Sequence, residues 1–311
     1  MSKVLQRPGK VISNKALTDK LYLLEVEVED IPTCLKPGQF IHLKVPGMEA
    51  HILRRPFSVF YVNERNSSLV ILYQVVGFGT SVMTGLVAGN TVDLMGPVGN
   101  GWKVPQVVQD CLDAQAPTVT TDAQAESASS ASQNSSDQAT QKSQSAQASQ
   151  PFQVSGKNVL LVAGGVGGAP LYLHAQELIE AGFDVSVIVG AQTKDALVVL
   201  NKYEELAPRN ILVATDDGSM GHKGFVTDLV KDQLANNKPD YLACCGPEPM
   251  MKIVSGLSLD AGVATAISLE KRMACGIGCC LSCVVSTTEG RKRACVDGPV
   301  FDAAEVIWDE D

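Results

Sequence analysis

The stretch that decides the organisation of this chain is Cys275-Gly-Ile-Gly-Cys-Cys-Leu-Ser-Cys283, which is followed by a further isolated cysteine. Four cysteines have the spacing C-x4-C-x2-C plus a distant fourth: Cys275, Cys280, Cys283 and Cys295. This is the plant-type spacing of [2Fe–2S] ligands. Gly276 and Gly278 allow positive φ angles, so backbone amides can approach the sulfur atoms of such a cluster. The sequence therefore predicts an iron–sulfur cluster loop.

Other uses of these cysteines remain open at this point. Cys279 is an additional thiol beside Cys280, and choosing it changes the spacing to C-x3-C-x3-C. A structural zinc site made of four cysteines usually has two C-x2-C pairs, whereas this segment has one. A set of disulfides or ordinary buried thiols is also compatible with the nine cysteines of the chain. The C-x4-C element favours the cluster.

Length and composition narrow the classes of function. The 311 residues suffice for two or three domains, and a hydrophobic fraction of 45% supports sizeable cores. The net charge of -9 argues against a nucleic-acid surface and against a polybasic membrane contact. We expect no membrane span, because no apolar run approaches the roughly 20 residues that one needs. We also expect no signal peptide, and the clustered cysteines suggest the reducing cytoplasm.

The first 104 residues are expected to form an antiparallel barrel. Short runs of branched and aromatic residues alternate with turn sequences such as Lys36-Pro-Gly, a pattern typical of small all-β domains. The expected strands cover residues 11–13, 21–28, 40–45, 58–62 and 69–76. A short helix is expected after Gly79, with Met83, Leu86 and Val87 on its buried face.

Two short motifs in this barrel suggest a flavin nucleotide. In Arg54-Arg-Pro-Phe-Ser58, a guanidinium can bind a phosphate in bidentate fashion and the serine hydroxyl can hydrogen-bond a flavin edge. In Gly77-Phe-Gly-Thr80, the beginning of the short helix offers free N–H groups to a pyrophosphate. Each motif alone is equally compatible with a solvated strand end or a plain turn. Their order along the chain favours a shared site.

Residues 105–156 change character to a low-complexity segment rich in Ala, Gln, Ser and Thr. Nothing between Ala114 and Gln150 can bury a core, so we expect disorder. We interpret this segment as an insertion at a surface loop between two domains, with Cys111 at its leading edge as a bystander.

Residues 157–262 alternate strands and helices, which predicts a doubly wound α/β domain. The apolar run 158–163 is followed directly by Gly164-Gly-Val-Gly-Gly168 and then by a helical stretch with Pro170 near its start. A dinucleotide phosphate would lie at this glycine turn, although the turn does not spell G-x-G-x-x-G. After the fourth strand, Cys245-Gly-Pro is expected to expose its thiol at the sheet edge, where a nicotinamide can lie. The alternative is a buried thiol before a turn.

The order of these motifs resembles the ferredoxin–NADP reductase superfamily. The C-terminal motifs, Ser268-Leu-Glu-x-Arg-Met-Ala-Cys-Gly-Ile-Gly and Cys295-x-Asp-Gly-Pro-Val-Phe, are similar to electron transfer subunits of class 1B dihydroorotate dehydrogenase. The resemblance covers nearly the whole chain outside about 105–156. It implies a β + α/β fold: an antiparallel FAD-binding barrel, a doubly wound NAD-binding domain and a small C-terminal [2Fe–2S] domain at 263–311.

The resemblance also implies three sets of binding residues. FAD would be bound by Arg55, Pro56, Phe57, Ser58, Leu72, Tyr73, Gln74, Gly79 and Thr80. NAD+ would be bound by Gly164, Gly165, Gly167, Gly168, Cys245, Gly246 and Pro247. The [2Fe–2S] cluster would be held by Cys275, Cys280, Cys283 and Cys295. NAD+ is expected rather than NADP+, because Gln192-Thr-Lys194 after the second α/β strand lacks the arginine that would favour a 2′-phosphate, although Lys194 could serve in its place.

The implied activity needs a second protein. An FMN-containing catalytic subunit would oxidise dihydroorotate in pyrimidine biosynthesis, in a heterotetramer of two subunits of each kind. Electrons would pass through the cluster and FAD of this chain to NAD+. The chain departs from the family pattern at Cys279 and in its polar insertion. The main alternative is a small flavin and iron–sulfur subunit of an NAD(P)H:ferredoxin oxidoreductase, a sulfide dehydrogenase or a hydrogenase. A redox sensor without enzymatic activity is a further alternative.

Overall fold

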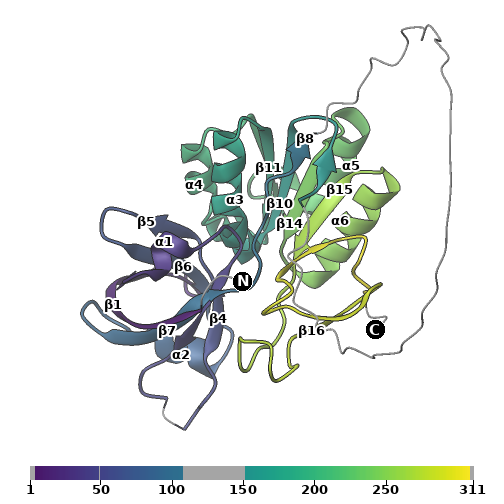
Figure 1. Cartoon of the computed structure of the whole chain (residues 1–311). Coiled ribbons are helices and arrows are strands. Elements are labelled where there is room, and N and C mark those ends of the chain that lie inside the picture. Colours follow the sequence, from purple (N-terminus) through teal and green to yellow (C-terminus); the bar gives the residue numbers. More distant parts are fainter. Residues whose placement is uncertain (1–3, 49, 108–150, 309–311) are drawn as a thin grey trace, which may run out of the picture.

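The computed structural model describes residues 4–48, 50–107 and 151–308. It contains two seven-stranded sheets and a C-terminal segment that contacts both. Figure 1 shows the first sheet below, the α/β layer above it, and the C-terminal segment, in yellow, on the side of helix α6. Most of the low-complexity insertion, with Cys111, lies outside the described residues.

The first sheet is antiparallel and curls into the predicted barrel. Its order is β4-β3-β7-β1-β2-β6-β5. The strands are β1 (Leu5–Ala16), β2 (Leu21–Val28), β3 (Phe40–Lys44), β4 (Arg55–Ser58), β5 (Tyr61–Asn63), β6 (Ser68–Gln74) and β7 (Thr91–Val98), with the short helices α1 (Ile31–Cys34) and α2 (Phe78–Met83). Alternation along the strands directs branched and aromatic side chains inward, where they form one core.

Helix α2 begins one residue before the predicted Gly79. Gly77 is its N-cap residue. Met83 and Leu86 are buried as expected. Val87 is 61% exposed, so its predicted place on the buried face is wrong, because the helix ends at Met83 and the chain turns away before Val87.

The second sheet is doubly wound, as predicted. Its order is β13-β12-β11-β10-β14-β15-β18, with parallel pairing from β13 to β15. The strands are β10 (Asn158–Gly164), β11 (Asp184–Ala191), β12 (Asn210–Thr215), β13 (His222–Lys223), β14 (Tyr241–Cys245), β15 (Ala264–Ser268) and β18 (Val300–Asp302). The helical elements are η1 (Gly165–Gly167), α3 (Gly168–Glu180), η2 (Lys194–Ala196), α4 (Leu200–Glu205), α5 (Val226–Asn236) and α6 (Glu248–Asp260). The strand order reverses between β10 and β14, where open α/β sheets bind ligands.

The cluster segment shares this second sheet. Strand β15 pairs with β14, and β18 adds an antiparallel edge to β15. Between them lie the cysteine loop and a hairpin of β16 (Val284–Thr287) and β17 (Gly290–Arg293). Phe40 of the barrel is buried in the same core as Cys283 and Cys295. The segment therefore packs on both other parts of the chain.

Both ends of the insertion are ordered. Strand β8 (Gln106–Val107) pairs in parallel with β9 (Gln153–Val154), and Val154 is buried in the core that covers the α3 face of the second sheet. Phe152 lies beside Tyr241, with ring centroids 5.3 Å apart. The polar insertion thus leaves and re-enters the fold at one place. No helix within the described residues is both long and apolar enough to cross a membrane.

Candidate cofactor and cluster site

The first predicted motif lies on β4, at the edge of the barrel sheet. Arg54, just before the strand, forms an ion pair with Asp93, in which Nη2 of Arg54 lies 2.6 Å from Oδ2 of Asp93. Arg55 forms no ion pair with a described residue, and its guanidinium lies against Gly79, where an added Cβ would be 2.7 Å from Nε. Of the two arginines, Arg55 is therefore the one available to an anion beside α2.

Thr80 holds the turn that begins α2. Its hydroxyl oxygen accepts hydrogen bonds from the backbone N–H groups of Val76 and Gly77, at 2.9 and 3.1 Å, and donates to the carbonyl of Gly77. These bonds fix the turn, and Gly79 of the turn lies against the guanidinium of Arg55. The two barrel motifs, which are far apart in sequence, thus meet at one end of the barrel.

The neighbouring strand β6 presents its predicted residues to different environments. Leu72 is buried in the core between barrel and α/β layer, whereas Gln74 is exposed. Tyr73 points into the barrel core, donates its hydroxyl to Asn14 at 3.2 Å, and has its pKa raised to about 12 by burial. A ligand on the outer face can therefore reach only the backbone of Tyr73.

The predicted glycine turn and the Cys245-Gly-Pro turn lie side by side at the sheet's switch point. An added Cβ on Gly167 would lie 2.4 Å from the carbonyl oxygen of Cys245, and one on Gly164 would lie 2.9 Å from Cδ of Pro247. A Cβ on Gly246 would lie 3.0 Å from Cα of Gly164. Three of these glycines are therefore required by close backbone packing.

Gly165 differs from the other glycines because it faces open space. Its φ is +55° and an added Cβ would meet no atom within 4 Å. Gly168 instead packs against Val199, with 2.8 Å to Cγ2. Gly165 is therefore the place in this turn where a bound phosphate can approach the backbone.

The thiol of Cys245 is not exposed, contrary to expectation. The residue is only 3% accessible, and its sulfur donates to the carbonyl of Ser268 at 3.7 Å. Burial raises the pKa of this thiol well above its ordinary value, which keeps it protonated. The rigid turn was correctly inferred, but the following strand β15 and its continuation cover the thiol.

The predicted cluster loop has the backbone that its glycines suggested. Gly276 and Gly278 have φ angles of +70° and +83°. The N–H of Ile277 points at the sulfur of Cys275, at 3.5 Å. Although burial raises the pKa of Cys275, hydrogen bonds from the backbone of Ile277 and Cys280 lower it to about 6. The loop therefore favours a thiolate at its first cysteine.

The four predicted ligands form two pairs. Cys275 lies beside Cys280, and Cys283 lies beside Cys295. The second pair is buried, and burial together with Cys283 raises the pKa of Cys295 to about 12. In the described residues, no three Cys, His, Asp or Glu side chains form a single metal-binding group. Two neighbouring pairs fit a [2Fe–2S] cluster, in which each iron takes two protein ligands.

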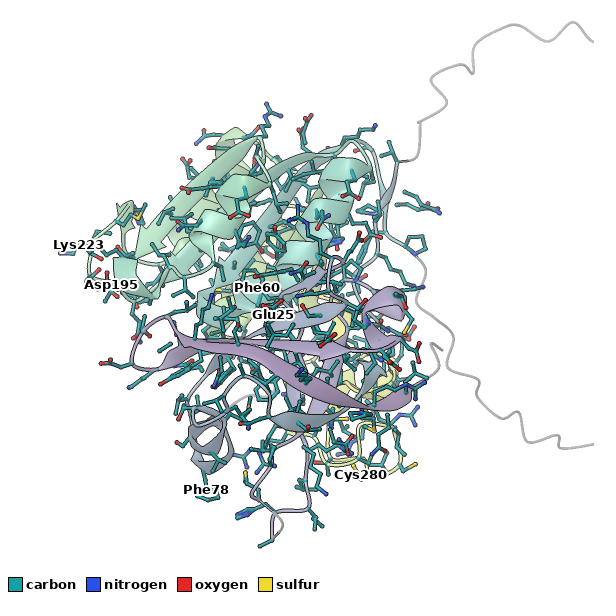
Figure 2. The ribbon with its side chains drawn as sticks, turned by 90° about the vertical axis from the view of Figure 1, so that its left-hand side faces the viewer. Glu25, Phe60, Phe78, Asp195, Lys223 and Cys280 are labelled. Carbon is teal, nitrogen blue, oxygen red and sulfur yellow. The ribbon has the colours of Figure 1, made fainter. Side chains whose placement is uncertain are left out.

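Cys279 stands apart from these pairs. Its thiol donates a long hydrogen bond, 4.0 Å, to the carbonyl of Ile277. It is exposed, as Cys280 is, and Figure 2 shows Cys280 at the edge of the molecule. The pairing of Cys280 with Cys275 favours the C-x4-C-x2-C assignment over the one that uses Cys279.

An arginine that the sequence analysis did not single out braces the loop. Arg293 donates from Nη1 to the carbonyl of Gly278 at 3.3 Å and from Nε to Asp297 at 3.1 Å. Asp297 raises the pKa of this guanidinium, and the nearby Cys295 and Cys283 raise it further. A fixed cation next to two cluster cysteines stabilises their thiolates.

Contacts with the barrel position the whole segment. The side chain of Asn100 donates to the carbonyl of Val296 at 3.0 Å, and its N–H donates to the carbonyl of Gly298 at 2.6 Å. An added Cβ on Gly276 would lie 2.9 Å from Cε of Met95 and 3.0 Å from Nε2 of His42. Sequence spacing cannot reveal these neighbours, because they come from distant strands of the barrel.

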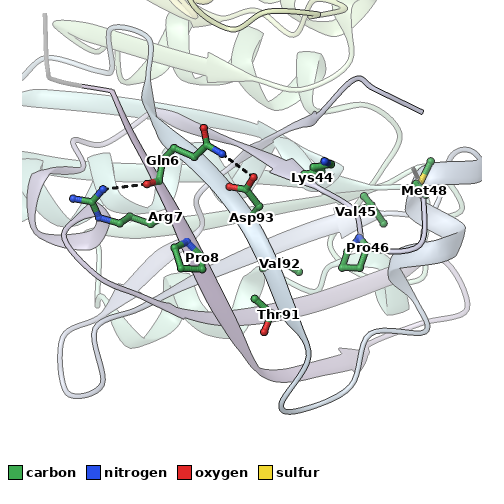
Figure 3. Close-up of a pocket in the computed structure, with 10 residues that line it drawn as sticks. All are labelled: Gln6, Arg7, Pro8, Lys44, Val45, Pro46, Met48, Thr91, Val92 and Asp93. Atoms are coloured by element: carbon green, nitrogen blue, oxygen red, sulfur yellow. Dashed lines mark hydrogen bonds between the residues drawn. The ribbon is translucent and has the colours of Figure 1, made fainter. Parts of the chain in front are cut away.

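A groove of considerable size lies elsewhere on the barrel. It has a volume of about 490 Å³, and Figure 3 shows Gln6, Asp93 and Lys44 among its lining residues. Gln6 donates to Asp93 at 2.9 Å. None of the predicted binding residues lines this groove. The candidate site is therefore the junction of barrel, glycine turns and cluster loop rather than this groove.

Comparison with known proteins agrees with this geometry. Residues 270–307 match the family model described as the iron-sulfur cluster binding domain of dihydroorotate dehydrogenase B, and residues 161–256 match the oxidoreductase NAD-binding domain. The chain is 31% identical over 313 aligned positions to a protein of Desulforamulus reducens, covering 99% of this chain and all of that protein. That protein is named dihydroorotate dehydrogenase B (NAD(+)), electron transfer subunit.

The chain belongs to this family of electron transfer subunits. A second relative of the same name, from Geobacillus sp. (strain WCH70), is 32% identical, covering 97% of this chain and 98% of the relative. This confirms the resemblance inferred from the C-terminal motifs, and with it the FAD, NAD and iron–sulfur character of the fold.

Solved structures place the family fold among reductases. An NADH-dependent reduced ferredoxin-NADP oxidoreductase structure has a TM-score of 0.75 and 28% identity, covering 96% of this chain and 90% of that one. A ferredoxin NADP+ reductase from Neisseria gonorrhoeae, solved with bound FAD and NADP, has a TM-score of 0.57 at 17% identity, covering 84% of this chain and 93% of that one. The second similarity shows the ferredoxin reductase fold that was predicted for the barrel and the α/β layer.

Proposed function

We propose that this chain is the electron transfer subunit of a dihydroorotate dehydrogenase, passing electrons from a catalytic subunit to NAD+. The observation that carries the proposal is the convergence of three motifs. The cluster loop packs on β3 through Gly276 and His42, and β3 pairs with the predicted flavin strand β4. The glycine turn at η1 contacts strand β6 of the barrel. Electron transfer needs this proximity. Identity of 31% and 32% to family members over nearly the full length of the chain supports the same conclusion.

We assign FAD binding to the outer face of β4 and the end of α2. Pairing in register with β3 places Pro56 opposite His42 and Ser58 opposite Phe40. Because Phe40 is buried in the core that includes Cys283 and Cys295, Pro56 and Ser58 face the same side as the cluster segment. Arg55 would bind a phosphate beside Gly79, while Tyr73 would contribute only its backbone.

We assign the [2Fe–2S] cluster to the two cysteine pairs, Cys275 with Cys280 and Cys283 with Cys295. Backbone amides and Arg293 stabilise the thiolates that such a cluster requires. When bound, the cluster carries single electrons, and FAD links one-electron transfer with the two-electron chemistry of NAD+. The protein contributes the ligands, the spacing and the exclusion of water around the buried pair.

We assign NAD+ to the turn at the switch point of the second sheet. Gly165 leaves its backbone open to a phosphate, whereas Gly164, Gly167 and Gly246 allow the two turns to pack tightly. Cys245 lies behind this surface as a buried, protonated thiol. We therefore assign it a packing role.

We propose that the partner subunit covers the cluster loop. Ile277 and Leu281 are 53% and 62% exposed and flank Cys279 and Cys280, which are exposed as well. In a complex, these apolar side chains would be buried against the partner. The partner would then also lie close to the cluster, which shortens the path for electrons. We further propose that the partner contains FMN and that two subunits of each kind assemble.

The similarity to the NADH-dependent ferredoxin-NADP oxidoreductase structure supports an alternative partner. Co-expression with candidate FMN proteins, co-purification, and an assay of dihydroorotate-dependent NAD+ reduction distinguish the two functions. The proposal predicts activity of the pair and none of the isolated chain. NADH oxidation that requires ferredoxin, with no dihydroorotate activity in any pair, would support the alternative instead.

A further inference from the structure

His42 is a buried side chain for which the protein provides no partner. It is completely inaccessible to solvent, yet neither Nδ1 nor Nε2 has a hydrogen-bond partner within the described residues. Buried polar side chains in native proteins are nearly always hydrogen-bonded, so each exception needs an explanation. His42 therefore has hydrogen-bonding capacity that a bound group can satisfy.

The ring lies where the barrel meets the cluster loop. Ile41 and Leu43, its neighbours on β3, point into the barrel core, so His42 points out of the barrel like Phe40. The rings of Phe40 and His42 have centroids 5.6 Å apart. The first turn of the loop closes over the imidazole at Gly276, next to Cys275.

The described side chains beside the ring offer its nitrogens no strong acceptor. Met95 has only a thioether, which is a weak acceptor, and Pro56 on the paired strand has no N–H to donate. Arg54 is an additional cation in the vicinity, but it is bound to Asp93 and has no acceptor to offer. The neutral imidazole therefore has one N–H donor for a bound group, and of the two groups assigned above the cluster is held by the loop that lies directly against the ring.

We propose that His42 donates a hydrogen bond to a sulfur atom of the [2Fe–2S] cluster. The inference rests on the cluster assignment made above. Hydrogen bonds to cluster sulfurs are among the factors that set the reduction potential, because they stabilise the more negative, reduced state. Through His42, strand β3 of the barrel thus influences the reduction potential of the cluster. His42 acts here as a positioning residue.

The test measures the reduction potential of the cluster in purified wild-type and variant chains whose iron, sulfide and FAD contents have been determined. His42→Leu removes the donor at similar volume, and His42→Gln retains one. The matched control is His174→Leu, since His174 is equally buried and has no hydrogen bond within the described residues, but is stacked on Trp102 in the α/β core, with Glu177 3.8 Å from its Nδ1. We expect His42→Leu to make one-electron reduction of the cluster about tenfold less favourable, a shift of about 59 mV. His42→Gln should recover most of that shift, and His174→Leu should leave the potential unchanged.

A measurement on the wild-type chain keeps the proposal testable if His42→Leu fails to fold or to load its cluster. The chain is labelled with 15N-histidine, reduced, and studied by pulsed electron paramagnetic resonance. We expect a 15N coupling and an exchangeable proton close to the cluster. In His42→Gln the 15N coupling should be lost, whereas an exchangeable amide proton should remain. An unchanged potential in loaded His42→Leu, a shift confined to the flavin, or absence of 15N coupling would overturn the inference. Wild-type protein without a cluster would instead refute the proposed function.

Discussion

Substitution by alanine should change the stability of the fold in opposite directions at two glycines of the α/β layer. An added Cβ on Gly167 would lie 2.4 Å from the carbonyl oxygen and 2.6 Å from the carbonyl carbon of Cys245, so backbone atoms must move. Gly256 lies in the exposed middle of α6, where an added Cβ would meet nothing within 4 Å. Gly167→Ala should therefore destabilise the fold, and Gly256→Ala should stabilise it.

The magnitudes follow from packing and from helix propensity. Gly167 has helical angles, φ -62° and ψ -13°, so alanine adds no backbone strain there and its whole effect is steric. Overpacking of this kind costs about 1–3 kcal/mol, and we expect the upper part of that range because backbone is less adaptable than side chains. Gly256→Ala should contribute about 0.5–1 kcal/mol of stability in the opposite direction.

Thermal unfolding of the two variants tests these values. For domains of 150–250 residues, about 1 kcal/mol corresponds to roughly 2–4 °C in Tm. We therefore expect Gly167→Ala to unfold roughly 4–12 °C below wild type and Gly256→Ala a few degrees above it. A Tm of Gly167→Ala equal to wild type would show that the two turns are not packed as described. If Gly167→Ala had an unchanged Tm and Gly256→Ala had a lower Tm than wild type, the reasoning about both sites would be refuted.

Four further predictions concern the binding residues. Cys280→Ser should abolish the cluster spectrum and NAD+ reduction while FAD is retained, whereas Cys279→Ser should retain both; equal losses of iron would contradict the assigned spacing. Arg55→Ala should lower the FAD content of purified chain by at least about tenfold, as expected for a lost charge-assisted phosphate contact, and full FAD occupancy would exclude this role. Gly165→Ala should destabilise the fold by only about 1–2 kcal/mol through its positive φ, yet raise the KM for NADH in an artificial-acceptor assay, and an unchanged KM would place the phosphate elsewhere. Tyr73→Phe should cost about 1 kcal/mol for the lost hydrogen bond to Asn14 without loss of FAD, which calorimetry and flavin absorbance together can check.

Local patterns predicted the backbone conformation of the cluster loop. The positive φ angles of Gly276 and Gly278 follow from the need for a tight loop, and spacing alone identified the four candidate ligands. Short-range rules could not place Cys245, because its burial depends on the neighbouring strand β15 rather than on its own turn. The same limitation applies to Val87, whose exposure follows from where α2 ends.

Long-range packing decided how the parts of the site meet. The ends of the polar insertion pair as β8 and β9, although their composition gave no strand prediction. Strand β18 joins the second sheet at its far edge, which draws the cluster segment onto the α/β layer. Each contact joins segments far apart in sequence, so residue spacing along the chain cannot encode it.

The sequence by itself determined the chemistry of this protein: cysteine spacing, glycine turns and the alternation that separates a barrel from an α/β layer. These properties depend on neighbours within a few residues, where bond geometry and side-chain type leave few choices. Only the tertiary structure decided that Cys275 pairs with Cys280 and that His42 faces the cluster loop. Such contacts result from the simultaneous burial of apolar faces on separate elements, a condition that no single stretch of sequence contains.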